Sequence, residues 1–154
     1  MPERLEERIS RKGLVIRGWA PQILILGHGS IEGFVTHCGW NSILEGVTAG
    51  LPFVTWPLFA EQFYNERLIV DVLKIGVPVG AKDYNWRPEE RSLIEAGTVE
   101  KAVSRLMGEG EEAEERRRRA RELGEMAKKA VAEGGSSYVD MSNLIQELKE
   151  MKRH

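Results

Sequence analysis

The sequence predicts an α/β fold built on a partial, doubly wound parallel sheet, followed by a helical C-terminal region. Short runs rich in β-branched and apolar residues alternate with helical patterns four times in the first half of the chain, which favours parallel strands joined by helices. Glycine or proline bounds most of these runs, as is typical where strands and helices meet. After residue 82 the composition becomes charged and helix-prone. We therefore expect one domain in two parts, residues 1–82 and 83–154.

Composition places the chain among ordinary globular proteins, with 154 residues, 42% hydrophobic and 30% charged. A net charge of −2 predicts no general attraction to nucleic acid or anionic membranes. No apolar run is long enough to span a bilayer, and the charged start does not resemble a signal peptide. The single cysteine, Cys38, excludes an internal disulfide and a cysteine-based zinc site and suits a reducing compartment. We expect a cytoplasmic protein.

Four short runs are the expected strands: residues 14–17, 33–37, 52–56 and 77–80. Between them we expect a short helix that begins at Pro21 and is closed by Gly27. A second helix is expected over residues 41–49 and a third over residues 61–73. The apolar face of the first of these helices consists of Ile23, Leu24 and Leu26.

The second part of the chain predicts three further helices, over residues 94–107, 111–133 and 138–151. The middle one contains the basic run 116–119, which could suggest nucleic-acid binding. Glutamates surround this run and cancel its field, so we interpret it as a solvated helix face and expect no nucleic-acid partner. The residues expected to face inward on the last helix are Leu144, Ile145 and Leu148.

Residues 33–48 read as a strand, a glycine turn and the start of a helix. The turn is a tight bend at Cys38, and Asn41 or Ser42 would supply the N-cap of the helix. Such a junction directs unpaired backbone N–H groups and the positive end of a helix dipole to one spot, where α/β proteins hold phosphate. An alternative remains open, because Ser42 and Glu45 also have the spacing of a capping box and could serve only to start the helix.

Further residues extend this junction into a longer pattern that resembles the donor-binding box of the plant secondary product glycosyltransferases, a family of UDP-dependent enzymes that modify small molecules. The box would occupy residues 19–62. The resemblance implies the C-terminal, Rossmann-like domain of the glycosyltransferase B fold. The residues that carry it are Trp19-Ala20-Pro21-Gln22, Thr36-His37-Cys38-Gly39-Trp40-Asn41-Ser42, Glu45, Pro57 and Glu61-Gln62.

The resemblance assigns the first box residues to the uridine end of a UDP-sugar. The indole of Trp19 would stack on uracil, and Gln22 with the backbone of Ala20 would complete the contacts to the nucleoside. The Glu45 carboxylate would accept the two ribose hydroxyls. The alternative for Trp19 is a core tryptophan, which is the commoner role of a lone indole.

The turn would hold the diphosphate. His37, Asn41 and Ser42 would bind it together with the backbone N–H groups of Gly39 and Trp40. A neutral His37 would donate one hydrogen bond, and a protonated one would add positive charge at the leaving phosphate. The alternative is a buried histidine whose hydrogen bonds are made by backbone.

Glu61 and Gln62 would bind the hydroxyls of the hexose, with Trp40 closing over the sugar. In the family the position of Gln62 bears on sugar choice, and glutamine there favours glucose over galactose. No acidic cluster suggests a catalytic metal, so we expect neither metal nor cofactor, with UDP-glucose as co-substrate.

The resemblance also implies what this chain lacks. An inverting transferase of this family uses a histidine, oriented by an aspartate, to deprotonate the acceptor hydroxyl, and both belong to the part that would precede this chain. We therefore expect no catalytic residue here, an acceptor pocket mostly in a missing N-terminal domain, and an inactive fragment of an enzyme of plant secondary metabolism. A non-catalytic sugar-nucleotide-binding module is the alternative. Such a fragment should be marginally stable or prone to associate.

One box position departs from the family pattern. Glu32 stands where the box usually has glycine. If this position requires a positive φ angle, a residue with a side chain costs about 1 kcal/mol there and alters the entry to the strand.

Overall fold

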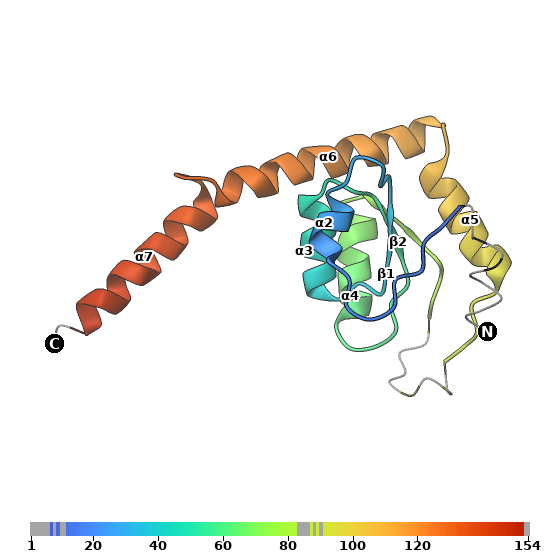
Figure 1. The fold of residues 1–154 in the computed structure, drawn as a ribbon, viewed down its shortest axis with the longest axis horizontal. Helices are drawn as coiled ribbons and strands as arrows, with labels where there is room; N and C mark the ends of the chain where they lie inside the picture. The colour runs from blue at the N-terminus through green and yellow to red at the C-terminus, as the bar shows by residue number, and fades with distance from the viewer. Residues whose placement is uncertain are drawn as a thin grey trace.

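The computed structural model describes residues 7, 9, 12–82, 87, 89 and 91–152. A small α/β body lies at the centre, one long helix runs across it, and the last helix extends away from it (Figure 1). In chain order the elements are α2 (Gln22–Leu26), β1 (Phe34–Thr36), α3 (Trp40–Thr48), β2 (Phe53–Thr55), α4 (Gln62–Arg67), the π-helix η1 (Leu68–Val72), β3 (Gly76–Pro78), α5 (Ala96–Met107), α6 (Glu111–Val131) and α7 (Ser136–Met151).

The sheet has three parallel strands in the order β1-β2-β3. Phe34 pairs with Phe53, and Val54 pairs with Val77, so the three strands are in register at their centres. Each connection crosses over through a helix, α3 after β1 and then α4 with η1 after β2. Three of the four predicted strands are therefore confirmed, each somewhat shorter than expected.

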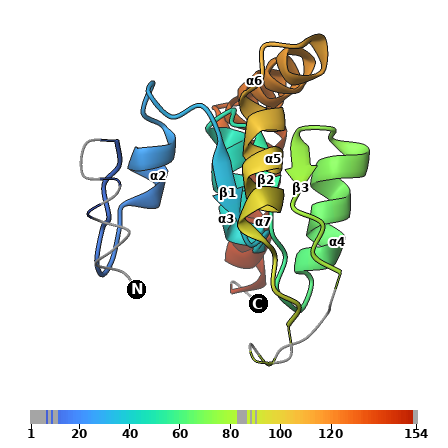
Figure 2. The ribbon, with the colours of Figure 1, turned by 90° about the vertical axis from the view of Figure 1, so that its right-hand side faces the viewer.

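The fourth predicted strand, at residues 14–17, is wrong, because this segment forms no strand. A strand needs a neighbour to complete its hydrogen bonds, and none of the described strands lies beside this segment. The N-terminal segment stands apart from the sheet together with α2 (Figure 2). Leu14 is 84% exposed as a result. β1 is then an edge strand of the sheet, with Val35 half exposed.

Helices cover both faces of the sheet, which confirms the doubly wound arrangement. Phe53 and Val54 are adjacent in β2, point to opposite faces and are both fully buried. The Phe53 side packs against Ile43 of α3 and Ala120 of α6. The Val54 side packs against Leu106 of α5. Two small apolar clusters, one on each face, thus hold the sheet between helices.

Close approaches between elements depend on two glycines. A Cβ on Gly46 of α3 would lie 2.6 Å from the ring of Phe53, so only glycine lets this helix lie flat on β2. A Cβ on Gly124 of α6 would lie 2.9 Å from Cα of Gly50, at the end of the turn after α3. Glycine at this position therefore lets α6 approach the backbone at the end of α3 closely.

The helix expected over residues 61–73 divides into α4 and the π-helix η1. The N–H of Leu73 donates to the carbonyl of Leu68 at 2.8 Å, a bond across five residues that widens the helix. Lys74 then adopts a left-handed φ of 56° and ends it. Ile69 is fully buried and packs against Gly76 at the start of β3, so the wide turn leads directly into the strand.

The basic run of α6 is only partly the solvated face that we predicted. Arg118 is half exposed and bonded to glutamates of its own helix. The side chain of Arg116, by contrast, is only 7% exposed. Arg117 donates to the carbonyl oxygens of Leu106 (3.3 Å) and Gly108 (3.0 Å), at the C-terminal end of α5. Two arginines therefore lie against the negative end of the α5 dipole, where cations are favoured.

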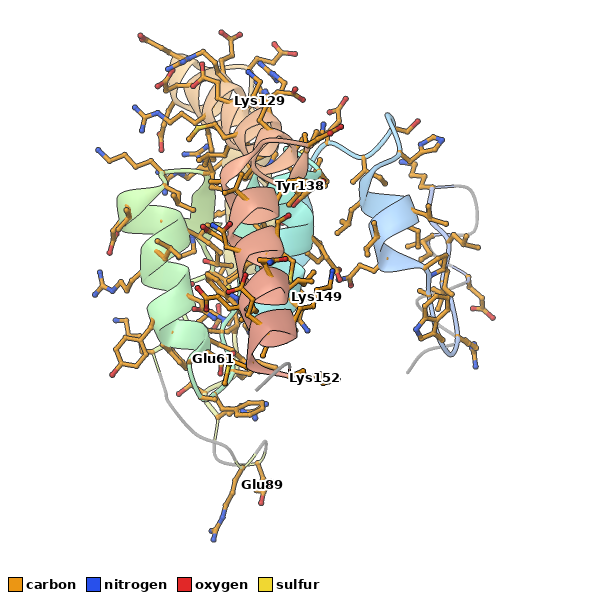
Figure 3. All side chains as sticks on the ribbon, turned by 90° about the vertical axis from the view of Figure 1, so that its left-hand side faces the viewer. Glu61, Glu89, Lys129, Tyr138, Lys149 and Lys152 are labelled. Atoms are coloured by element: carbon orange, nitrogen blue, oxygen red, sulfur yellow. The ribbon has the colours of Figure 1, made fainter. Side chains whose placement is uncertain are left out.

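The last helix, α7, extends away from the body (Figure 1), and no residue of it is buried. Its side chains project on all sides, as the labelled Tyr138 and Lys149 illustrate (Figure 3). The inward-facing assignment of Leu144, Ile145 and Leu148 is wrong in this chain, because these side chains are 45–53% exposed. The apolar stripe exists in the sequence, but in the described structure the helix contacts little besides the end of α6. No described helix is both long and apolar enough to cross a membrane.

Candidate functional site

The carboxyl end of β1 leads into α3 through a bend centred on Cys38, as the sequence predicts. Cys38 is fully buried and has a left-handed φ of 66°, while Gly39 is extended and serves as the N-cap of α3. The expected N-cap at Asn41 or Ser42 is wrong. The helix begins at Trp40, so both polar residues lie in its first turn instead.

This junction presents the free end of a helix. No described side chain caps α3, so the N–H groups of its first turn keep the unpaired character of a helix N-terminus. The side chain of His37 is exposed, which excludes the alternative of a buried histidine. Its ring crosses directly over Gly39, where a Cβ would collide with Nε2. An imidazole and a helix N-terminus thus meet at the carboxyl end of β1, and Asn41 and Ser42 lie in the first turn of that helix. This arrangement is suited to an anion.

Gln22 joins α2 to α3. Its Nε2 donates to Oε2 of Glu45 at 2.6 Å and to Oγ of Ser42 at 3.4 Å. The capping-box alternative is therefore wrong, because Ser42 and Glu45 bind the glutamine of another helix and not the backbone at the start of their own. These two hydrogen bonds bring together residues that are 20 and 23 positions apart in the sequence.

A hollow of about 560 Å³ opens beside this pair. Trp19, Ala20 and Glu45 are among the residues that line it. Trp19 is 88% exposed, so the alternative of a core tryptophan is wrong. An exposed indole next to a carboxylate and a carboxamide can offer both a stacking surface and hydrogen bonds to a planar, hydroxylated ligand.

Glu61 and Gln62 lie at the start of α4, after the loop that follows β2 (Figure 3). Glu61 is exposed, whereas Gln62 is 5% exposed. The Oε1 of Gln62 accepts hydrogen bonds from the backbone N–H groups of Leu58 (2.9 Å) and Phe59 (3.1 Å). The oxygen of this carboxamide is therefore occupied by its own loop, and only the NH₂ group remains to bind a ligand.

Glu32 is exposed and is not among the residues with positive φ. The strain that a missing glycine would cause at this position is therefore absent. The left-handed residues with side chains lie elsewhere, and two of them, Cys38 (φ 66°) and Ala60 (φ 55°), are next to expected site residues.

Two residues of α4 that the sequence analysis missed make hydrogen bonds close to the junction between β1 and α3. Asn65 donates from Nδ2 to the carbonyl oxygen of Cys38 at 2.9 Å. The hydroxyl of Thr55 donates to Oε2 of Glu66 at 2.5 Å. Burial raises the pKa of Glu66, and burial together with the nearby Glu66 raises the pKa of the Cys38 thiol to about 12. The only sequence signal was that Asn65 stands one helical turn after Gln62.

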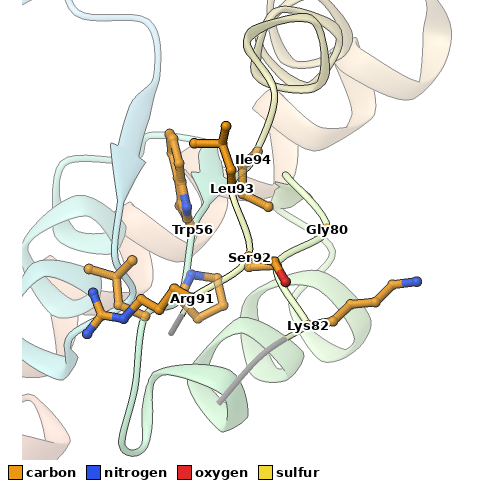
Figure 4. Close-up of a pocket in the computed structure, with 10 residues that line it drawn as sticks. Trp56, Gly80, Lys82, Arg91, Ser92, Leu93 and Ile94 are labelled. Atoms are coloured by element: carbon orange, nitrogen blue, oxygen red, sulfur yellow. The ribbon is translucent and has the colours of Figure 1, made fainter. Parts of the chain in front are cut away.

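A second hollow, of about 290 Å³, lies on the α5 side of the sheet (Figure 4). Trp56 and Leu93 face it, and Lys82 and Arg91 stand at its rim. Pro57 of the box also lines it, but none of the residues expected to contact the donor does. In the part of the chain that the structure describes, no three His, Cys, Asp or Glu side chains gather as metal ligands would.

The sequence profile described as "UDP-glucoronosyl and UDP-glucosyl transferase" matches residues 2–77. UDP-glycosyltransferase 73B4 of Arabidopsis thaliana is 60% identical over 99% of this chain, which covers 31% of that protein. The crystal structure of UGT73P12 from Glycyrrhiza uralensis, complexed with glycyrrhetinic acid 3-O-monoglucuronide, matches 98% of the chain and 31% of its own length, at 48% identity and a TM-score of 0.93.

A third match holds a donor analogue. The structure of Phytolacca americana UGT2 complexed with UDP-2fluoro-glucose and pterostilbene is 38% identical, has a TM-score of 0.81 and covers 95% of this chain and 32% of its own. The chain thus spans about a third of the length of the relatives it matches. The three parallel strands with helices on both faces match the Rossmann-like domain of the glycosyltransferase B fold in these neighbours. By sequence and by fold, this chain belongs to the plant UDP-glycosyltransferase family.

Proposed function

We propose that this chain is the UDP-sugar-binding part of an inverting glycosyltransferase that transfers glucose to small hydroxylated plant metabolites. The observation that carries the proposal is the contact of Gln22 with Glu45 beside the exposed indole of Trp19. It brings a stacking surface, a carboxamide and a carboxylate together, the set of groups that uridine needs. A similar structure holding UDP-2fluoro-glucose supports the same class of ligand.

In this proposal the uracil stacks on Trp19, and the backbone of Ala20 and the side chain of Gln22 bind its polar edge. The ribose hydroxyls donate to the Glu45 carboxylate. The second oxygen of that carboxylate is not engaged by Gln22, whose amide bonds to Oε2. A diol can therefore bind without first breaking the contact between the two helices.

The diphosphate lies at the N-terminus of α3. The N–H groups of Gly39 and Trp40 point at it, and His37, Asn41 and Ser42 donate from their side chains. The helix dipole and these donors offset the charge that develops on the departing UDP, so the proposed mechanism needs no metal.

The hexose extends towards the start of α4. Glu61, which is exposed, accepts hydrogen bonds from sugar hydroxyls, and Trp40 covers the ring. Gln62 takes part only through its NH₂ group, because its oxygen is engaged by the loop. A donor group at that position suits a hydroxyl oxygen, and the proposal keeps glucose as the preferred sugar.

The catalytic base and most of the acceptor pocket belong, in this proposal, to a part of the protein outside this chain. The chain alone then binds the donor without transferring it, and it acts in the cytosol within plant secondary metabolism. The second candidate, a sugar-nucleotide-binding module without catalysis, has the same ligand. Joining this chain to the N-terminal part of a relative, followed by a transfer assay, separates the two.

Calorimetric titration with UDP, UDP-glucose and UDP-galactose tests the donor site. Trp19→Ala should weaken UDP binding by about 5- to 150-fold, the equivalent of a stacking energy of 1–3 kcal/mol. His37→Ala should weaken UDP as well. Tyr138→Ala, on the distant α7, is the matched aromatic control and should bind as the unmodified chain does. A folded chain that binds none of the three nucleotides overturns the proposal.

A further inference from the structure

The bend at Cys38 is an unfavourable backbone conformation that other contacts must stabilise. Left-handed angles cost a residue with a Cβ about 1–2 kcal/mol, and Cys38 adopts them at φ 66° while fully buried. On its N-terminal side the bend is fixed by Thr36. The Cys38 N–H donates to the Thr36 hydroxyl at 3.3 Å, and the thiol donates to the Thr36 carbonyl at 3.7 Å.

On the C-terminal side, the bend is fixed by one side chain. Nδ2 of Asn65 donates to the carbonyl oxygen of Cys38 at 2.9 Å. That carbonyl belongs to the same planar peptide as the N–H of Gly39, and in a trans peptide the two groups point in opposite directions. Asn65 therefore sets the direction of the Gly39 N–H, which must point away from α4.

Asn65 itself is anchored. Its backbone N–H bonds to the carbonyl of Glu61 at 3.0 Å in the first turn of α4. One turn earlier, Gln62 holds the loop after β2 through two backbone N–H groups. The start of α4 thus carries two carboxamides, one bonded to each of the two loops that border the candidate site.

We propose that Asn65 is a positioning residue for the diphosphate of the donor. It holds the Cys38–Gly39 peptide in the one orientation that aims the Gly39 N–H, and the helix N-terminus behind it, at the phosphates. Asn65 touches no ligand; it acts through the turn. The inference rests on the proposed donor function and adds to it a residue outside the expected donor set.

If Asn65 served only to stabilise the fold, its substitution would weaken the binding of every ligand equally and at every pH. The test therefore compares the affinities for UDP and for uridine, which lacks the diphosphate. Asn65→Ala should weaken UDP by about 5- to 10-fold, as the loss of one partly buried hydrogen bond predicts, and change uridine by less than about 2-fold. Trp19→Ala is the matched comparison, because it should weaken UDP and uridine to the same extent. Equal losses of UDP and uridine in Asn65→Ala, or no loss of UDP, overturn the inference.

Asn65→Asp supplies a second test, because aspartate has nearly the same size and shape as asparagine. At neutral pH a carboxylate faces the Cys38 carbonyl without a hydrogen to donate, so UDP binding should fall at least as far as in Asn65→Ala. As the pH falls, the carboxyl group introduced by this substitution becomes protonated and can donate to that carbonyl again. The ratio of UDP affinities, Asn65→Asp over Asn65→Ala, should therefore rise at acidic pH, and a ratio that stays constant contradicts the inference.

Amide hydrogen exchange shows whether each variant alters the turn itself. In the UDP-bound chain the phosphates should protect the amides of Gly39 and Trp40 from exchange. Asn65→Ala should lower this protection, while the exchange of the α5 amides stays unchanged. An unmodified chain that binds no UDP overturns the proposed function directly, before any variant is made. An unmodified chain that binds UDP, with Gly39 exchange unaltered by Asn65→Ala, overturns the role of Asn65 alone.

Discussion

Nε2 of Gln22 lies 2.6 Å from Oε2 of Glu45, and this contact joins the first residue of α2 to the middle of α3. Most of the apolar surface of α2 faces away from the body, with Ile23 67% and Leu24 75% exposed. Of the three residues in the predicted apolar face of this helix, only Leu26 is therefore buried. With so little apolar burial, the position of α2 depends strongly on this polar contact at the candidate site.

This contact leads to a prediction about ribose recognition. Glu45→Ala should weaken UDP by about 10- to 100-fold, since hydrogen bonds to a charged group contribute roughly 1.5–3 kcal/mol each. With the 2′,3′-dideoxy analogue of UDP the same substitution should cost much less, because no ribose hydroxyl remains to donate. Calorimetry on both ligands measures the difference.

Glu61→Ala is the control for that experiment, because it removes another carboxylate of the candidate site, although Glu61 is exposed and Glu45 is half-buried. It should leave the affinity for UDP unchanged and lower the affinity for UDP-glucose. A Glu45→Ala penalty that is equal for UDP and its dideoxy analogue would show that Glu45 acts only by holding Gln22.

A second prediction concerns the packing of α3 on the sheet. Gly46→Ala should destabilise the chain by about 1–3 kcal/mol, because the new methyl group would meet the ring of Phe53 at 2.6 Å. Gly97→Ala is the control in α5, where nothing lies within 4 Å of the new Cβ. It should stabilise the chain by roughly 0.5–1 kcal/mol through helix propensity alone. Urea denaturation followed by circular dichroism measures both, and equal effects would contradict the packing.

The local sequence pattern was sufficient to predict the elements whose contacts lie within the described chain. The bend at Cys38, three of the strands and the helices of the second half follow from residue spacing, and all are present. The strand at 14–17 and the inward face of Leu144 were wrong, because each depends on a partner that the described chain does not provide. The bond from Asn65 to Cys38 spans 27 residues, and no periodicity indicates which side chain will reach a given carbonyl.

A third prediction uses the only cysteine as a reporter of the turn. Cys38 is fully buried and burial raises its pKa to about 12, so at pH 8 its thiol is both inaccessible and protonated. The folded chain should react with a disulfide reagent at least about 100-fold more slowly than the same chain in urea, because reaction must wait for opening. Absorbance of the released thiolate measures both rates. Rapid labelling in native buffer would mean that the turn opens locally.

The fourth prediction concerns Glu66, whose carboxylate accepts a hydrogen bond from the hydroxyl of Thr55 in β2. Burial raises its pKa above the ordinary value of 4.5. Between pH 4.5 and the folded pKa, the native chain therefore binds more protons than the unfolded chain. The stability that Glu66 contributes is then present below the unfolded pKa and is lost as the pH rises through the folded pKa.

Glu66→Gln removes this ionisation and keeps an oxygen that can accept from Thr55. Its free energy of unfolding, relative to the unmodified chain, should rise as the pH goes from about 4.5 to about 7.5, because only the unmodified chain must then bury a charge. Glu133→Gln, on an exposed side chain after α6, is the control and should follow the unmodified chain across the range. Urea titrations at several pH values give the curves. If Glu66→Gln also ran parallel to the unmodified chain, the carboxylate would be solvated and α4 would lie less tightly on the sheet than its hydrogen bonds to Thr55 and Cys38 require.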